Sequence, residues 1–413
     1  MNEKLKFCEG FDFETNDMYV ILANTYNGNC LKLTNECFYI LKCSIDENLT
    51  CAQILDQFED DSDKEYFKKI LNFCMLNDII VPDGYVERTS LDVVITDRCN
   101  LGCRHCYMSS VDVTSDDKLS FNDWKDIFDS FAEYADEINI SGGEPLMRED
   151  IYDIIDYIRG ISDAHITLST NGTMITEYNV KKLCDTFNSF SISFDGVDEE
   201  SCSKIRGKYV FEKAVKAVKL IHMYDPEKKI SASMVLSKDN SSLCQRFKEL
   251  CNELNMTPLL RHLSPLGRAS DNPQLFSDKV AILKANLDDS NKQYLCDNID
   301  ECMACRGGLR RIAINYDGKL YPCMPLINKE FCMGEAKDVK SLEEYLNRGD
   351  NLKSSGLNNF FNNYKMNTSN KCRDCSVKLH CCTCQLNAYL MKKSDMFEMI
   401  CAQNKQKLSV IWR

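Results

Sequence analysis

From residue 91 onward, short apolar runs alternate with helix-length segments, and this rhythm constrains the fold more than any other feature of the chain. The alternation predicts βαβ units around a parallel sheet. Six such units in about 190 residues suit an open, partial (β/α)6 TIM-like barrel better than a closed eight-unit barrel of about 250 residues. The predicted strands are residues 91–96, 137–141, 165–170, 190–194, 230–236 and 258–263, and the predicted helices are 120–135, 149–159, 177–186, 210–224 and 240–254.

Three cysteines follow the first of these runs directly. Cys99, Cys103 and Cys106 have the spacing C-x3-C-x2-C and fall where the carboxyl end of a barrel strand carries an active-site loop. A structural zinc site or an ordinary iron-sulfur cluster takes four protein ligands, so one position is unfilled. Zinc, with His105 or a remote cysteine as the fourth ligand, is an alternative that the spacing leaves open.

Polar signatures also follow the later strands: "SGGEP" at 141–145, "TNG" at 170–172 and "SISFDG" at 191–196. Together with "CNLGCRHCY" they resemble the radical S-adenosylmethionine (SAM) superfamily. The resemblance implies a 4Fe-4S cluster on the three cysteines, with SAM on the fourth iron and a 5'-deoxyadenosyl radical formed from it. It also implies SAM contacts from Gly142, Gly143 and Glu144 (amino group), His105 and Tyr107 (adenine), Asn171 (ribose), Ser193 and Asp195 (ribose or carboxylate) and Arg206 (carboxylate).

Cysteines also gather in the C-terminal part of the chain, where the strand-helix rhythm fades. Their order resembles the SPASM extension of radical SAM enzymes, which carries two auxiliary 4Fe-4S clusters. The resemblance implies an outer cluster on Cys372, Cys375, Cys381 and Cys401, and an inner cluster on Cys305, Cys323 and Cys384 with Cys302 or Cys332 as a possible fourth ligand. The chain departs from the pattern after Cys381, because Cys384 follows after two residues instead of three and Cys382 adds ambiguity. Paired zinc knuckles are the alternative for this segment.

The N-terminal part reads as a small separate unit. Two strand candidates flank Asn27-Gly28-Asn29 as in a hairpin, and three amphipathic helices follow, two of them beginning with a threonine suited to N-capping. This layout is winged-helix-like and resembles PqqD-like domains, which bind the leader segment of a precursor peptide as an added strand. A winged helix used for packing or for nucleic acid is the alternative. Residues 1–90 hold 17 acidic against 8 basic side chains, which counts against nucleic acid.

Composition and charge narrow the possible partners and cellular compartment of the chain. The formal net charge of −13 argues against a duplex nucleic-acid partner, and the sequence has no run of 18 apolar residues and no secretion signal at its start. We therefore expect a cytoplasmic chain without a membrane partner. Disulfides seldom persist in a reducing cytoplasm, so 24 cysteines point to metal or redox use.

These interpretations combine into three predicted domains: a PqqD-like domain at 1–88, a radical SAM partial barrel at 89–295 and a SPASM domain at 296–413. The resemblances imply a maturase of a ribosomally made precursor peptide that forms an intramolecular thioether or carbon-carbon crosslink. They also imply an electron donor such as flavodoxin or ferredoxin. The alternatives are a radical SAM/SPASM enzyme for another substrate, such as a haem precursor, a sulfatase residue or a small alcohol, and a non-enzymatic multi-zinc protein. Nothing in the sequence separates crosslink formation from epimerisation.

Overall fold

The computed structural model describes residues 3–85, 89–110, 116–276, 305–342, 345, 372, 374–381, 384 and 397–412. The chain forms two compact units, one of residues 1–87, 286–307 and 359–413 and the other of residues 88–285 and 308–358. We describe each unit by itself. The division into domains at 1–88, 89–295 and 296–413 stays a prediction.

The larger unit contains a nine-stranded sheet in the order β11-β10-β9-β8-β7-β6-β12-β13-β14. Neighbouring strands from β6 to β11 pair in parallel, so the six predicted strands and their parallel arrangement are confirmed. Their bounds are β6 Ser90–Val94, β7 Glu137–Ser141, β8 His165–Thr170, β9 Ser189–Ser193, β10 Lys229–Leu236 and β11 Thr257–His262. Three strands that the sequence did not predict extend the other edge: β12 Arg311–Ile314 pairs in parallel with β6, and β13 Lys319–Tyr321 and β14 Gly334–Glu335 continue antiparallel.

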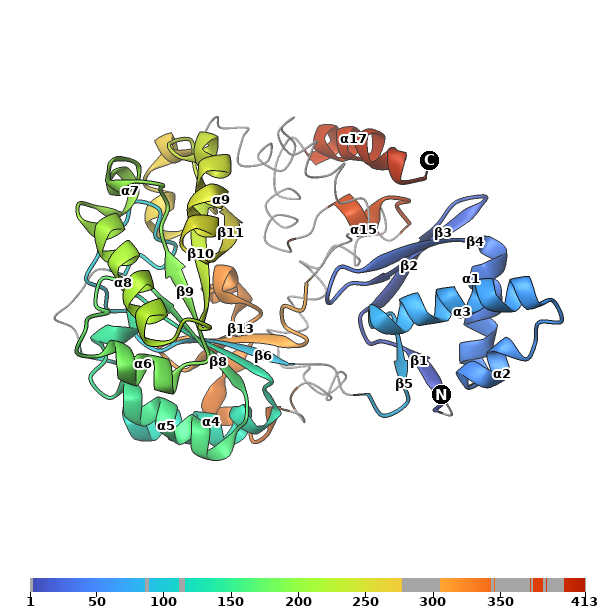
Figure 1. Ribbon diagram of the computed structural model, residues 1–413, viewed down its shortest axis with the longest axis horizontal. Coiled ribbons are helices and arrows are strands. Elements are labelled where there is room, and N and C mark those ends of the chain that lie inside the picture. The colour runs from blue at the N-terminus through green and yellow to red at the C-terminus, as the bar shows by residue number, and fades with distance from the viewer. Residues whose placement is uncertain are drawn as a thin grey trace. The chain divides into compact units, whose positions relative to one another are not determined.

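Helices cover one face of this sheet (Figure 1). They are α4 Phe121–Phe131, α5 Ile151–Ile161, α6 Val180–Thr186, α7 Glu199–Arg206, α8 Val210–Tyr224 and α9 Cys244–Glu253. In α4 the buried residues Trp124, Ile127, Phe128 and Phe131 follow the i, i+3, i+4, i+7 spacing of an amphipathic helix, and Ser120 closes its N-terminus with a capping box. The larger unit is therefore an α/β structure with a mostly parallel central sheet.

The two faces of the sheet differ in chemistry because side chains alternate along each strand. The residues that pack against the helices are apolar, for example Leu91, Val93, Ile138, Ile140, Ile166 and Leu168. The residues between them are mostly polar: Asp92 on β6, Asn139 on β7, Ser169 on β8 and Ser233 on β10. The parallel strands thus leave one polar face beside the loops at their carboxyl ends.

The smaller unit begins with β1 Leu5–Phe7, β2 Phe11–Thr15, β3 Tyr19–Asn24 and β4 Cys30–Thr34, followed by α1 Asn35–Asp46, α2 Cys51–Leu55, α3 Asp61–Leu76 and β5 Ile80–Pro82. Strands β2, β3 and β4 form an antiparallel sheet, and β1 pairs with β5. Thr34 and Thr50 cap α1 and α2 as predicted, and Thr50 forms a capping box with Gln53. The hairpin and the three helices are present, whereas β1 and β2 were not predicted. The winged-helix-like domain type stays a prediction.

The C-terminal cysteine segment packs within this smaller unit. It includes α15 Lys378–Cys381 and α17 Phe397–Leu408. One face of the three-stranded sheet packs on the helices, and the other contacts this segment through Ile21, Ala23, Cys30, Val377, Leu379, Leu408 and Ile411. Lys378 Nζ donates to Asp12 Oδ1 at 2.9 Å, and His380 Nδ1 lies 3.2 Å from Glu14 Oε1. Burial lowers the pKa of His380, but Cys30 and Glu14 outweigh it and raise this pKa to about 9.

Short 3-10 turns complete the described elements: Ala132–Tyr134, Pro145–Met147, Ser241–Leu243, Gly267–Ala269, Pro273–Leu275, Met324–Leu326, Lys329–Phe331, Ala336–Asp338 and Ser409–Trp412. Among the helices that the structure describes, none is both long enough and apolar enough to cross a membrane.

Candidate functional site

The loop after β6 brings the three predicted cluster cysteines close together. Cys99 and Cys103 are buried and Cys106 is half-buried. Burial raises the pKa of Cys99 to about 11, and the nearby thiols of Cys103 and Cys106 add to this rise. Burial also raises the pKa of Cys103, while the guanidinium of Arg206, whose Nη1 lies 3.9 Å from Cys103 Sγ, opposes the rise. A metal that binds these sulfurs must therefore displace their protons.

A turn after β11 clamps this loop from the side. Arg268 donates from Nε to Cys103 O at 2.8 Å and from its backbone N to Cys106 O at 2.9 Å. Gly267 has φ +54°, and a Cβ there would lie 2.3 Å from Tyr107 O, so only glycine fits this close approach. Sequence reasoning missed both residues, because "PLGRAS" shows no signal beyond an ordinary turn.

Gly142 and Gly143 allow two loops of the protein to approach each other. Gly143 N donates to Thr96 O at 2.9 Å, and Glu144 N donates to Arg98 O at 2.8 Å. A Cβ on Gly142 would lie 2.6 Å from Thr96 O, and one on Gly143 would lie 2.2 Å from Arg98 O. The predicted close backbone approach is therefore present, but between the loops after β7 and β6. Contact of these glycines with SAM stays a prediction.

Glu144 is fully buried and joins the ends of two strands. Its carboxylate accepts hydrogen bonds from Thr170 Oγ1 and Asn171 N, each at 2.8 Å, and from Leu146 N at 3.3 Å. Burial raises the pKa of Glu144, and the hydrogen bonds from Asn171 and Thr170 oppose the rise. The Asn171 side chain donates to Asn100 Oδ1 at 2.8 Å, which connects it to the cysteine loop.

Three other predicted residues meet in one buried ionic group. Asp195, which is fully buried, accepts from Arg206 Nε at 2.6 Å, and its Oδ2 lies 2.6 Å from His105 Nε2. Val235 N donates to the other carboxylate oxygen at 2.6 Å. Burial raises the pKa of Asp195, but the charges of Arg206 and His105 outweigh it and hold this pKa well below its usual range. The group ties the cysteine loop to the end of β9 and to the last turn of α7.

The two remaining predicted SAM contacts, Tyr107 and Ser193, have other neighbours. Tyr107 donates from Oη to Met324 Sδ at 3.6 Å, and burial raises its pKa. Ser193 ends β9, half-buried and in register with Ser233 of β10.

The residues present fit a 4Fe-4S cluster with bound SAM. The loop presents three neighbouring thiols, an arginine lies beside one of the sulfurs, and His105 Nδ1 is buried without a partner among the described residues. No three His, Cys, Asp or Glu side chains in the described ranges converge on a point where one metal ion could bind. Thiolates of a four-iron cluster bind different irons and so need not converge in that way.

The structure also brings together the four cysteines predicted for the outer auxiliary cluster. Burial raises the pKa of Cys381 to about 11, and the thiols of Cys375, Cys401 and Cys372 contribute to the rise, so all four are neighbours. Asn404 Nδ2 donates to Cys381 Sγ at 3.4 Å.

The inner cluster is a different case. Its predicted ligands divide between the units: Cys323 and Cys332 belong to the larger one and Cys305 and Cys384 to the smaller one, while Cys302 lies outside the described residues. The inner ligand set therefore stays a prediction.

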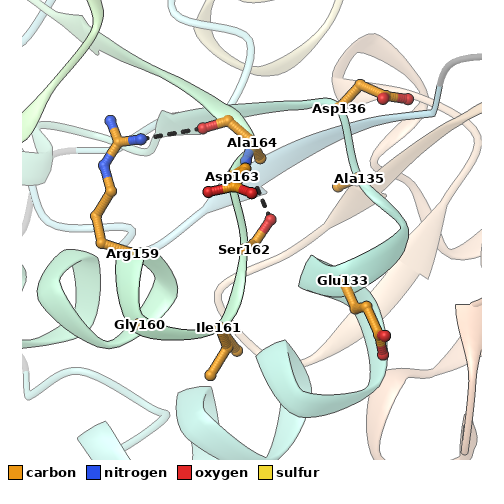
Figure 2. A pocket seen from close by; sticks show the side chains of 9 residues that line it. All are labelled: Glu133, Ala135, Asp136, Arg159, Gly160, Ile161, Ser162, Asp163 and Ala164. Atoms are coloured by element: carbon orange, nitrogen blue, oxygen red, sulfur yellow. Dashed lines mark hydrogen bonds between the residues drawn. The ribbon is translucent and has the colours of Figure 1, made fainter.

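A surface pocket of about 490 Å3 lies at the amino ends of two central strands, opposite the ends that carry the cysteine loop (Figure 2). It is lined by residues that precede β7 and β8, at their amino ends: Glu133, Ala135, Asp136, Arg159, Gly160, Ile161, Ser162, Asp163 and Ala164. Arg159 Nη1 donates to Ala164 O at 3.1 Å, so this arginine stabilises the loop that connects α5 to β8. The pocket is remote from the cysteine loop along the strands.

Comparisons with known proteins agree with this geometry. Residues 93–242 match the model of the radical SAM superfamily, and residues 305–376 match that of the SPASM iron-sulfur cluster-binding domain. Mycofactocin maturase MftC of Mycolicibacterium smegmatis is 33% identical over 183 residues, which are 43% of this chain and 45% of that protein. An AdoMet-dependent heme synthase of Oleidesulfovibrio alaskensis is 31% identical over 180 residues, 43% of this chain and 46% of that protein. The matched part thus spans less than half the length of these relatives.

Two solved structures share the fold. SuiB of Streptococcus suis, bound to precursor peptide SuiA, has a TM-score of 0.57 at 14% identity and covers 95% of this chain and 97% of its own. Native anSMEcpe with bound AdoMet has a TM-score of 0.51 at 18% identity and covers 78% of this chain and 99% of its own. The chain therefore contains a radical SAM domain, built on the parallel sheet, followed by a SPASM iron-sulfur domain.

Proposed function

We propose that this protein is a radical SAM maturase of a ribosomally made precursor peptide. It generates a 5'-deoxyadenosyl radical from SAM, abstracts a hydrogen atom from the peptide and forms an intramolecular thioether or carbon-carbon crosslink. The observation that carries the proposal is the extent of the likeness to SuiB, which covers 95% of this chain, including the N-terminal unit. SuiB was solved with a precursor peptide, whereas the likeness to anSMEcpe covers 78%.

The N-terminal unit supplies the leader-binding part of the proposal. An extended peptide adds to the edge of a small sheet, and among the described residues β2 and β4 each pair only with β3. Residues 1–90 have a charge balance of −9, which suits a leader with basic side chains. We assign this role to the predicted PqqD-like domain, residues 1–88.

The cofactors of the proposal are SAM and three 4Fe-4S clusters. Cys99, Cys103 and Cys106 hold the cluster that binds SAM, and Cys372, Cys375, Cys381 and Cys401 hold the outer auxiliary cluster. The inner cluster takes Cys305, Cys323 and Cys384, with Cys302 or Cys332. A cytoplasmic flavodoxin or ferredoxin supplies the electron, and neither nucleic acid nor a membrane takes part.

The decisive experiment varies the peptide, not the enzyme. Deletion of residues 1–85 would remove β3, against which Val377 and Leu379 of the cysteine segment pack, and would therefore confuse leader binding with loss of structure. Short peptides encoded in the neighbouring open reading frames should instead be tested with and without their leaders, by anaerobic turnover and mass spectrometry. Loss of two hydrogens from the full-length peptide alone is the expected result.

Two other outcomes would contradict the proposal. Equal modification of the leaderless peptide would refute leader recognition. An unmodified peptide, with SAM cleavage intact, would favour a non-leader substrate such as a haem precursor, a sulfatase residue or a small alcohol; the relative named as a heme synthase supports that second candidate. Iron and sulfide analysis tests the multi-zinc alternative, because three clusters require about twelve irons per chain.

A further inference from the structure

A row of hydrogen-bonded side chains crosses the polar face of the parallel sheet. Arg311 of β12 donates to both carboxylate oxygens of Asp92 on β6, at 2.6 and 3.0 Å. Asn139 of β7 donates to Asp92 Oδ1 at 3.1 Å and accepts from Ser169 Oγ of β8 at 2.7 Å. Four adjacent strands therefore carry polar side chains that satisfy one another, and the charge of Arg311 is paired.

Arg261 continues this polar face on β11 at the far edge of the parallel strands. Leu260 packs against the apolar core, so its neighbour Arg261 points to the opposite side of the sheet. Arg261 is in register with Val235 of β10, whose backbone N donates to Asp195. The arginine thus lies on the strand next to β10, whose Val235 N donates to the buried ionic group.

Arg261 differs from the other arginines of this region in having no partner among the residues that the structure describes. Arg206 is paired with Asp195 and Arg311 with Asp92, whereas no described residue forms an ion pair or hydrogen bond with Arg261, which is exposed. Although the side chain is accessible to solvent, the surrounding protein partly desolvates the guanidinium and lowers the pKa of Arg261. The charge of Arg311 lowers this pKa further, and Asp92, Tyr107 and Asp195 oppose the shift. A cation in this position is stabilised by an anionic ligand.

We propose that Arg261 anchors a carboxylate group on the polar face of the sheet. A guanidinium presents two parallel N–H donors that match the two oxygens of a carboxylate. The inference rests on the proposed function, because the carboxylate belongs to one of the two molecules that reaction brings together: the methionyl part of SAM, or an acidic side chain or C-terminus of the peptide. In either case Arg261 is a binding and specificity residue of the site.

Chemical modification tests this without turnover. The full-length, anaerobically purified protein is treated with phenylglyoxal, and the modification rate of each arginine is followed by mass spectrometry. Arg261 should react faster than Arg311, which has both ends of its fork bound to Asp92. A bound carboxylate at ten times its dissociation constant should slow the reaction at Arg261 about tenfold by mass action. Arg246, an exposed arginine of α9 with partners Glu249 and Glu253, is the control whose rate should not change.

The probes separate the two sources of the carboxylate. Protection by SAM but not by N-acetylglutamate would assign the anchor to the cofactor, and protection by N-acetylglutamate would assign it to the substrate. N-acetylglutaminamide, which carries amides in place of both carboxylates of N-acetylglutamate and is therefore neutral, should not protect Arg261. The proposal is overturned if Arg261 reacts no faster than Arg311, if no carboxylate protects it, or if the amide protects as well as the acid. Because the readout is a modification rate, a failure here does not depend on whether the peptide is modified.

Discussion

Replacement of Asp195 by asparagine tests the buried ionic group most directly. Asp195 is fully buried and has φ +55°, a conformation that asparagine adopts more readily than most residues, so Asp195→Asn removes the charge with little backbone strain. It leaves the guanidinium of Arg206 buried without its counter-charge. Breaking a buried ion pair by removing one partner costs about 3–5 kcal/mol. At about 2–4 °C per kcal/mol for a unit of this size, the melting temperature should fall by roughly 6–20 °C.

Urea unfolding of the anaerobically purified protein measures the decrease in the free energy of unfolding that Asp195→Asn causes. The matched control is Asp239→Asn, which breaks a partly exposed pair with Arg104 (3.3 Å) and should cost about 0–1 kcal/mol. The double variant Asp195→Asn, Arg206→Met should recover part of the loss, because it removes the unpaired cation. If Asp195→Asn costs no more than Asp239→Asn, Asp195 does not stabilise the fold through its charge.

The pH dependence of the same difference has a defined sign. The pKa of Asp195 is lower in the folded state than in the unfolded chain, so its stabilisation is fully present above about pH 4, the unfolded value. It is lost as the pH falls toward the folded pKa. The difference between wild type and Asp195→Asn should therefore be constant from neutral pH down to about pH 5 and should shrink below about pH 4.

Three further predictions follow from the site and its supports. Cys99→Ala, Cys103→Ala or Cys106→Ala should abolish 5'-deoxyadenosine formation and lower iron content by up to one cluster, and full turnover by any of them would contradict the assignment. Gly143→Ala should lower the free energy of unfolding by about 1–3 kcal/mol, because its Cβ would lie 2.2 Å from Arg98 O. Gly160→Ala in α5 meets open space and should raise the free energy of unfolding by about 0.5–1 kcal/mol. Equal melting temperatures for the two variants would argue against the loop contact at Gly143. Thr50→Ala should destabilise the N-terminal unit by about 1 kcal/mol and Thr50→Ser should not, as measured by hydrogen exchange in α2.

Local patterns predicted the parts of the fold that depend on neighbouring residues. The six parallel strands are apolar runs bounded by polar turns, and Thr34 and Thr50 are helix caps that act within three residues. Strand β2 was missed because its burial is the reverse of what side-chain hydrophobicity predicts: Phe13 is exposed and Glu14 is buried. The buried Glu14 is satisfied by Leu379 and His380, more than 360 residues away. Pairing of β12 with β6 is equally non-local, and no local pattern encodes it.

In the site, too, local sequence patterns predicted some features and missed those that depend on residues far apart in the chain. Spacing and position after successive strands predicted which residues gather there, and the structure brings His105, Asp195 and Arg206 into contact. The sequence did not predict that these residues bind one another, because that depends on a left-handed backbone at Asp195 and on the last turn of α7. The clamp by Arg268 was missed for a related reason, since its partners are backbone carbonyls, which every residue carries.

The position of β12 also affects how the protein is made. Strand β6, from which the cysteine loop emerges, lies between β7 and β12, and β12 is synthesised about 220 residues after β6. At 5–20 residues per second, one edge of β6 waits roughly 10–45 s on the ribosome before its neighbour exists. An unpaired strand edge is a template for aggregation. Soluble yield in a foreign host should therefore respond to chaperones and to slower synthesis before it responds to the supply of iron.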